Sequence, residues 1–220
     1  MSPEDWKPIY EKILEEFGYD RSSDENSARL LKAVMVNADL ISDDDVVMRR
    51  DATVFGCGGG LEDDMKKVSP RGTLIASGAS AGALERMGIT PHIVVTDLDG
   101  EIGPQIDASR RGAVTFIHAH GDNSHLIQRY AKEFTGPVIL TTQSRPDNLV
   151  SNYGGFTDGD RAVCIARHFG AEDILLLGFD FSTPSIKEGS DPKIKAMKLR
   201  WAEKIIFGCG RPGTSVEMPR

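Results

Sequence analysis

Cysteine and tryptophan are scarce in this chain of 220 residues, and it has no long hydrophobic run. The three cysteines, Cys57, Cys164 and Cys209, are odd in number, far apart and outside any C-x-x-C spacing. They therefore argue against a disulfide framework or a zinc site and predict reduced thiols. No segment reaches the length of a membrane span, and the N-terminus has no signal-peptide pattern. We therefore expect a cytoplasmic protein without a membrane partner.

Basic residues are too few to form a dense positive stripe. The chain has 26 Lys and Arg against 33 Asp and Glu, a net charge of −7. Such a balance argues against a nucleic-acid partner, because the phosphates of a polymer need many basic side chains for neutralisation. Small phosphate-bearing substrates stay open, since glycine amides, helix N-termini and Mg²⁺ can also bind phosphate.

From residue 51 onward, apolar β-rich runs alternate with helical patterns. The runs predict strands near 52–55, 73–76, 92–96, 114–118, 137–141 and 173–178. Helices are predicted near 61–68, 80–87, 104–111, 124–134, 160–169 and 192–207. This alternation indicates an α/β fold with a mostly parallel sheet of about six strands and helices on both faces. In such sheets ligands bind beyond the carboxyl ends of the strands.

The first 50 residues precede any predicted strand. An amphipathic helix is predicted over 4–17, and a second helix is predicted to start after Ser22, where Ser22-x-x-Glu25 fits a capping box, and to run toward Leu40. We therefore expect a helical N-terminal extension over 1–50 and an α/β catalytic domain over 51–220, with a loosely ordered tail from Gly208. The oligomeric state stays open, a homo-oligomer included.

The segment from Val94 to Gly100 carries an apolar strand directly into Asp97 and Asp99. Carboxylates in this position favour Mg²⁺, which proteins usually bind through one or two carboxylates together with substrate phosphates. A plain turn is the first alternative. A haloacid-dehalogenase-type phosphatase, with D-x-D-G-T after its first strand, is the second. Glu101 stands in place of that Thr, and at least two strands come earlier, so a metal-bound nucleotide site is favoured.

Small residues follow the first two predicted strands. Gly56, Gly58 and Gly59 could let backbone amides approach a phosphate, or could simply form a tight turn. A dinucleotide fingerprint is not matched, because Leu61 occupies its last glycine position. Ser77 and Ser80 flank a narrow site for a base or sugar, and Ser80 is alternatively a helix cap.

The fourth predicted strand ends in two histidines, followed by an acid and an amide. Asp122 is predicted to help hold Mg²⁺, whereas His118 and His120 would orient substrate or contact phosphate. His120 is the one candidate for a general base. Asp122 and Asn123 could equally cap the next helix.

Polar residues also follow the later strands. Thr142 and Gln143 could bind a heterocycle or a ribose. Further along, phosphate or heterocycle binding is predicted for Gly154, Gly155, Asp158 and Arg161, which lead into a helix, and for Asp180 after the last predicted strand. Asp158 is alternatively an N-cap and Asp180 a turn residue.

Four motifs in series resemble those of the archaeal 6-hydroxymethyl-7,8-dihydropterin pyrophosphokinase family. They are T-D-L-D-G at 96–100, H-A-H-G-D-N at 118–123, T-T-Q at 141–143 and G-G-F-T-D-G-D-R at 154–161, and the resemblance covers roughly residues 50–207. G-I-T-P at 88–91 is also similar to thiamine pyrophosphokinase catalytic domains, which share that fold. Relatives usually have an acid where this chain has Ser77, and G-x-G-P-S-L where it has 56–61.

The resemblance implies ATP as donor, Mg²⁺ as cofactor, transfer of diphosphate to a pterin hydroxymethyl group and release of AMP. The implied partners are thus the two small substrates. Thiamine pyrophosphokinase, or a catalytically silent nucleotide-binding protein, are the alternatives.

Overall fold

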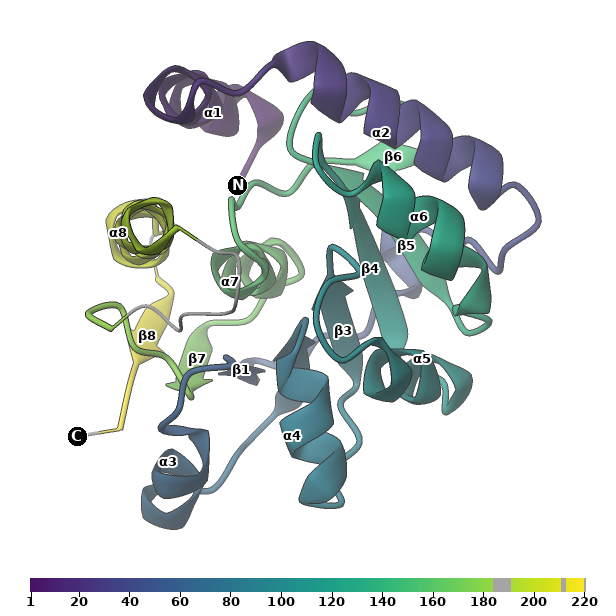
Figure 1. Ribbon diagram of the computed structural model, residues 1–220. Coiled ribbons are helices and arrows are strands. Elements are labelled where there is room, and N and C mark those ends of the chain that lie inside the picture. Colours follow the sequence, from purple (N-terminus) through teal and green to yellow (C-terminus); the bar gives the residue numbers. More distant parts are fainter. Residues whose placement is uncertain (184–190, 211–212, 220) are drawn as a thin grey trace.

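A single parallel sheet forms the centre of the computed structural model, which describes residues 1–183, 191–210 and 213–219. Within these residues the sheet has eight strands in the order β6-β5-β4-β3-β2-β1-β7-β8 (Figure 1). The strands are β1 (Asp51–Phe55), β2 (Thr73–Ser77), β3 (Ile93–Thr96), β4 (Val114–Ala119), β5 (Val138–Thr142), β6 (Val150–Ser151), β7 (Asp173–Leu177) and β8 (Ser215–Glu217). The predicted α/β class is confirmed, with two more strands than the predicted six or so.

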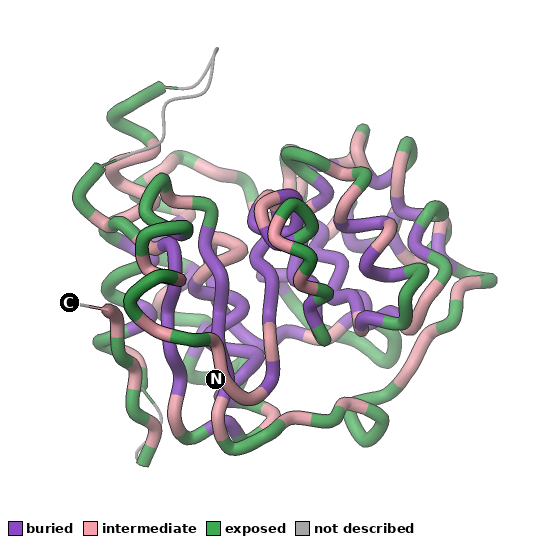
Figure 2. Tube along the Cα trace, turned by 90° about the horizontal axis from the view of Figure 1, so that it is seen from below, coloured by how far each residue is buried: buried purple, intermediate pink, exposed green. Residues whose placement is uncertain are grey.

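Helices cover both faces of the sheet because successive strand residues point to opposite sides. Val95 and Phe116 pack with α7 (Asp158–His168), whereas Val94 and Ile117 face the opposite helices. Those opposite helices are α2 (Arg21–Val34), α3 (Leu61–Lys67), α4 (Ser80–Arg86), α5 (Ile102–Arg110) and α6 (Ser124–Tyr130). Short 3₁₀ turns occupy Asp43–Asp45 and Ala131–Glu133. The central strands are accordingly buried along their length (Figure 2).

The first helix packs on the side of α7. Trp6, Tyr10 and Ile13 of α1 (Pro3–Phe17) form a buried cluster with Cys164 of α7 and with Trp201 of α8 (Pro192–Gly208). Figure 1 shows α1 and α8 beside α7, with α2 reaching across toward α6. No helix among the described residues is both long enough and apolar enough to cross a membrane.

The crossover after β6 positions the functional edge. Strands β1 to β6 add in chain order toward one side, and α7 then brings the chain back to place β7 beside β1. All paired strands are parallel, so the loops that follow β1 to β7 meet at one edge of the sheet. Helix α7 begins at that edge and packs on β1, β2 and β3.

Several local predictions were wrong in detail. The cap of α2 is Asp20, whose Oδ1 accepts from Ser22 N at 3.0 Å, and the helix ends at Val34 rather than near Leu40. Ser80 lies inside α4 and does not cap it; Ala79 precedes the helix without a side-chain cap. The tail, expected to be loosely ordered, contributes β8, which pairs with β7. The tail residues 211, 212 and 220 lie outside the described residues.

Candidate active site

The turn after β3 holds its two acids in a strained backbone. Leu98, between Asp97 and Asp99, has a φ of +70° and is the one described non-glycine residue with a positive φ. Such a conformation costs on the order of 1–3 kcal/mol. A buried network compensates: Leu98 N donates to Thr96 Oγ1 at 2.8 Å, and Thr96 Oγ1 donates to Gln105 Oε1 at 2.5 Å. Gln105 Nε2 donates in turn to Asp99 O at 2.9 Å, so α5 fixes the turn from below.

Asn123 joins the ends of β3 and β4. Its Nδ2 donates to Asp97 O at 2.9 Å and to His118 O at 2.7 Å, while its Oδ1 accepts from His120 N at 3.0 Å. The side chain makes no cap bond to α6, although Asn123 precedes that helix. Asn123 therefore ties together the two loops that carry the predicted catalytic residues.

His120 and Asp97 form a pair at this edge, with 3.3 Å between His120 Nε2 and Asp97 Oδ2. Asp122 N donates to His120 Nδ1 at 3.4 Å, so the ring proton lies on Nε2 and points to the carboxylate. Burial would raise the pKa of Asp97, but the hydrogen bond from His120 and the positive charge of Arg161 lower it to about 2. Asp97 is therefore held ionised.

Asp158 and Arg161 add a second charged pair from the first turn of α7. Arg161 Nη1 donates to Asp158 Oδ1 at 2.8 Å, and the Arg161 side chain is only 3% exposed. A Cβ on Gly78 would come within 2.5 Å of Asp158 Oδ2, so the loop after β2 leaves room for this carboxylate. Burial and the negative charge of Asp97 raise the pKa of Asp158 well above its ordinary range, although Arg161 opposes the rise.

His118 lies beneath these charged groups. It is buried, and its ring centroid is 6.0 Å from that of His120. His118 Nδ1 lies 3.0 Å from Thr141 Oγ1, at the end of β5. Burial and the positive charge of Arg161 keep the pKa of His118 well below its usual value. We call Asp97, His118, His120, Asp158 and Arg161 the strand-end cluster.

A hard cation suits the chemistry of this edge. Burial and the charges of Asp97 and Asp99 raise the pKa of Asp158, so negative charge gathers at this edge and a bound cation would offset it. Carboxylate oxygens are also the ligands that Mg²⁺ prefers. Among the described residues no three acidic, histidine or cysteine side chains already form a metal-binding group. Asp122 is exposed and contacts the cluster through its backbone.

The small residues after β1 and β2 make contacts within the protein. Gly56 N donates to Leu177 O and Gly58 N to Gly178 O, each at 2.8 Å, and a Cβ on either glycine would meet Gly178 O. Gly59 is exposed with open space around its Cα. Ser77 Oγ donates to Phe55 O at 2.7 Å. Ser80 Oγ is buried and has no hydrogen-bond partner among the described residues.

Later predicted residues divide between the edge and supporting turns. Gln143 is buried next to the cluster, and Thr142 Oγ1 accepts from Ser144 N at 3.2 Å. Gly154 and Gly155 have φ values of +80° and +97°, and a Cβ on Gly155 would come within 2.4 Å of Arg161 Cα.

Asp180 Oδ1 accepts from Ser182 N and Thr183 N, as in the turn alternative. Burial has little effect there, and the Ser182 hydrogen bonds lower the Asp180 pKa to about 2.

Sequence reasoning missed two residues that support the site. Gln105 is fully buried in α5 and holds the Asp97–Glu101 turn, and Asp24 is buried in α2 and contacts the loop after β4. Neither has a local signal, because an acid in a helix's first turn and an amide in a helix are both common on surfaces.

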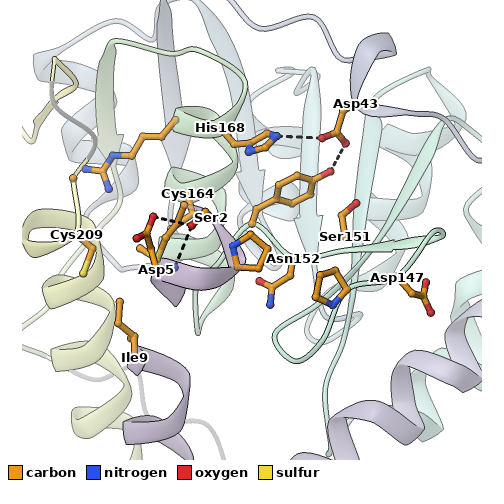
Figure 3. A pocket seen from close by; sticks show the side chains of 16 residues that line it. Ser2, Asp5, Ile9, Asp43, Asp147, Ser151, Asn152, Cys164, His168 and Cys209 are labelled. Atoms are coloured by element: carbon orange, nitrogen blue, oxygen red, sulfur yellow. Dashed lines mark hydrogen bonds and ion pairs between the residues drawn. The ribbon is translucent and has the colours of Figure 1, made fainter. Parts of the chain in front are cut away.

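A cavity of about 880 Å³ lies away from the strand-end cluster, along the later turns of α7. Figure 3 shows its wall, where His168 points to Asp43. The Tyr153 hydroxyl also donates to Asp43 Oδ1. Cys164 and Cys209 also line it. We call it the α7 cavity. Burial raises the pKa of the Cys164 thiol to about 12, so this thiol stays protonated at neutral pH.

The fold and the strand-end cluster define an α/β protein whose charged edge is suited to phosphate chemistry. The chain belongs to the 6-hydroxymethylpterin diphosphokinase MptE-like family, whose model matches residues 25–185. This family is the one that the motifs predicted.

Three relatives are each named 6-hydroxymethyl-7,8-dihydropterin pyrophosphokinase. The protein from Pyrococcus furiosus is 41% identical, with 93% of this chain and 89% of the relative covered. That from Methanothermobacter thermautotrophicus is 38% identical, with 97% of both covered. That from Methanocaldococcus jannaschii is 33% identical, with 94% and 95% covered.

The similarity to a solved glycosyltransferase structure concerns the fold alone. The MAf glycosyltransferase from Magnetospirillum magneticum AMB-1 is 14% identical and superposes with a TM-score of 0.57. The superposition covers 89% of this chain but 37% of the glycosyltransferase chain, so the present fold spans about a third of that protein.

Proposed function

We propose that this protein transfers diphosphate from ATP to the hydroxymethyl group of 6-hydroxymethyl-7,8-dihydropterin and releases AMP. The strand-end cluster is the observation that carries the proposal, because it places an ionised Asp97 beside Arg161, Asp158 and two histidines at one edge. The names of the three relatives support the acceptor.

In the proposed reaction the acceptor hydroxyl oxygen bonds to the β-phosphorus of ATP. The bond from that phosphorus to the bridging oxygen of the α-phosphate breaks, AMP leaves with the electron pair, and the hydroxyl proton is released to solvent. Mg²⁺, held by Asp97 and Asp99 with Asp122 as a further predicted ligand, would neutralise the charge on the phosphates when bound. Most of the remaining rate enhancement would come from positioning.

The residues of the edge have separate tasks in this reaction. The His120 proton on Nε2 faces Asp97, and its Nδ1 accepts from Asp122 N, an arrangement that favours an orienting role for His120 over that of a general base. Arg161 supplies a fixed positive charge that would offset the negative charge of the phosphates. Its bond to Asp158 holds it at the start of α7.

The acceptor follows from a physical difference between the two candidates. A pterin is neutral and rich in hydrogen-bond donors and acceptors, whereas thiamine carries a fixed positive charge. Both tryptophans, Trp6 and Trp201, are buried among α1, α7 and α8, so neither ring offers an open face to a bound cation. Polar side chains such as Gln143 and Asp158 suit the pterin better.

The decisive experiment incubates the protein with ATP, Mg²⁺ and each acceptor and follows AMP by chromatography. We expect the hydroxymethyl pterin to react with at least a tenfold higher kcat/KM than thiamine, which corresponds to about 1.4 kcal/mol in transition-state binding. Equal values, or a preference for thiamine, would overturn the acceptor but leave the chemistry. ATP binding without AMP formation from either acceptor would indicate a catalytically silent nucleotide-binding protein.

A further inference from the structure

Asp24 is a buried acid in α2, only 3% exposed, and it lies far in sequence from the strand-end cluster. Three donors from three different elements converge on its carboxylate. Tyr10 of α1 donates its hydroxyl to Oδ2 at 2.6 Å, and Gln143 Nε2 donates to the same oxygen at 2.9 Å. Gly121 N donates to Oδ1 at 2.7 Å. Hydrogen bonds to an ionised acceptor in a buried place are among the stronger ones in proteins.

Two of those donors belong to functional loops. Gly121 lies between His120 and Asp122, and Gln143 follows β5. The backbone at Gly121 comes so close to α2 that a Cβ there would be 2.9 Å from Ser23 Cβ. Trp6 Nε1 of α1 donates to Gln143 O at 2.8 Å, so the N-terminal helices hold this residue at both ends. These contacts are more specific than those of a helical cap packed on apolar surface.

We propose that Asp24, in the first turn of α2, is a positioning residue for the active edge. One oxygen of Asp24 fixes the loop that carries His120 and Asp122, and the other orients the Gln143 side chain toward the cluster. The His120–Asp97 contact depends on where that loop lies, so Asp24 acts on Asp97 through the loop. This role rests on the proposed function for its catalytic consequence.

Two matched controls separate positioning from simple stability. Tyr10→Phe removes one donor from Asp24 but leaves the bonds to Gly121 and Gln143. Ser27→Ala removes the 2.6 Å contact between Ser27 and Ser124, which joins α2 to α6 without touching the loop of His120. Asp24→Asn keeps the size of the side chain but removes the charge and one acceptor.

We expect Asp24→Asn to lower kcat for AMP formation by about 10- to 100-fold while KM for ATP stays within about threefold, because misplaced groups affect the transition state more than substrate binding. Tyr10→Phe and Ser27→Ala should keep kcat within about twofold, even where they lower Tm. A folded Asp24→Asn protein with wild-type kcat would overturn the proposal.

Amide hydrogen exchange gives a readout that needs no turnover. Protection of the Gly121 N–H should be lost in Asp24→Ala, which leaves no acceptor for it, and kept in Tyr10→Phe, and unchanged protection in Asp24→Ala would overturn the proposal. If the wild type forms no AMP, the proposed function fails while this measurement still decides the positioning role. If Asp24→Asn fails to fold, Gly121→Ala decides, because its new Cβ should push the loop from α2 and lower kcat to a similar extent.

Discussion

The molecule contains two His–Asp pairs with similar geometry and different surroundings. His120 Nε2 lies 3.3 Å from Asp97 Oδ2 at the strand-end edge, and His168 Nε2 lies 3.1 Å from Asp43 Oδ2 on the wall of the α7 cavity. Asp97 is surrounded by Arg161, Asp158 and a second histidine. Asp43 instead accepts a hydroxyl hydrogen bond from Tyr153, next to open volume.

The comparison shows that charge, rather than volume, distinguishes the proposed site. The cavity offers space, yet Asp43 and Asp147 on its wall are already paired within the protein: Asp43 binds Tyr153 and His168, and Asp147 binds Lys32. At the sheet edge burial and the charges of Asp97 and Asp99 raise the pKa of Asp158, and such a shift is typical of functional sites. The edge is also where parallel sheets bind ligands.

Removing divalent metal should have the largest effect and should act on the edge alone. We expect a chelator to abolish AMP formation and Mg²⁺ or Mn²⁺ to restore it, because carboxylate oxygens favour hard cations. Added Mg²⁺ should raise Tm in the wild type and in Asp43→Asn, but not in Asp97→Asn. Tightly bound stoichiometric zinc in the purified protein would point instead to the histidines.

The second-largest difference in turnover is expected between variants in which the acid of one or the other His–Asp pair is neutralised. Asp97→Asn or Asp99→Asn should lower turnover by about 100- to 1000-fold with the fold intact, since charge neutralisation at the phosphates is lost. Asp43→Asn, the same change in the other pair, should keep turnover within a few-fold and lower Tm instead. Near-normal turnover of both edge variants at saturating Mg²⁺ would remove these acids from the site.

Replacing the histidine of each pair should lower kcat less than replacing the acid does, and the loss should still differ between the two pairs. We expect His120→Gln to lower kcat by about 10- to 100-fold, because Asp97 loses its orienting partner. His168→Gln should stay within about twofold of the wild type. Steady-state kinetics with circular dichroism as the folding control would test this, and equal losses in the two variants would contradict the distinction.

The smallest expected effect concerns stability at the edge. The folded-state pKa of Asp158 is raised by burial and by Asp97, so its ionised form is disfavoured in the folded protein. Stability from this group is therefore present below its unfolded pKa and is lost as pH rises through the folded pKa. Asp158→Asn should match the wild-type Tm near pH 4 and exceed it increasingly at higher pH, while turnover falls. A lower Tm at pH 8 would contradict this sign.

The sequence was informative where the signal is local. The fourth strand was predicted over 114–118 and is found at Val114–Ala119, because a buried parallel strand requires an apolar run that is visible without a partner. The two edge strands were missed, since β6 has two residues and β8 has three, too few for a pattern. The family resemblance was likewise readable, because it rests on motifs of fixed spacing.

Most of the candidate site was located by a rule about sheets: residues that follow parallel strands share one edge. This rule brought Asp97, His120 and Asp158 together before their contacts were known. It says nothing about which atoms pair, so the roles predicted for the site residues stay predictions. The hydrogen bonds from the Gly56 and Gly58 amides to the end of β7 and the residue after it were not foreseeable either, since their acceptors lie more than a hundred residues away.

Local composition and spacing determined the six longer strands, most helices, the order of the loops and the family. The tertiary structure alone decided that Leu98 turns left-handed above Gln105, that Arg161 is buried on Asp158, and that Asp24 reaches Gly121 across 97 positions of sequence. The physical reason is that periodicity is a property of neighbouring residues. A buried hydrogen bond between distant segments exists only once the packed core has brought its donor and acceptor together.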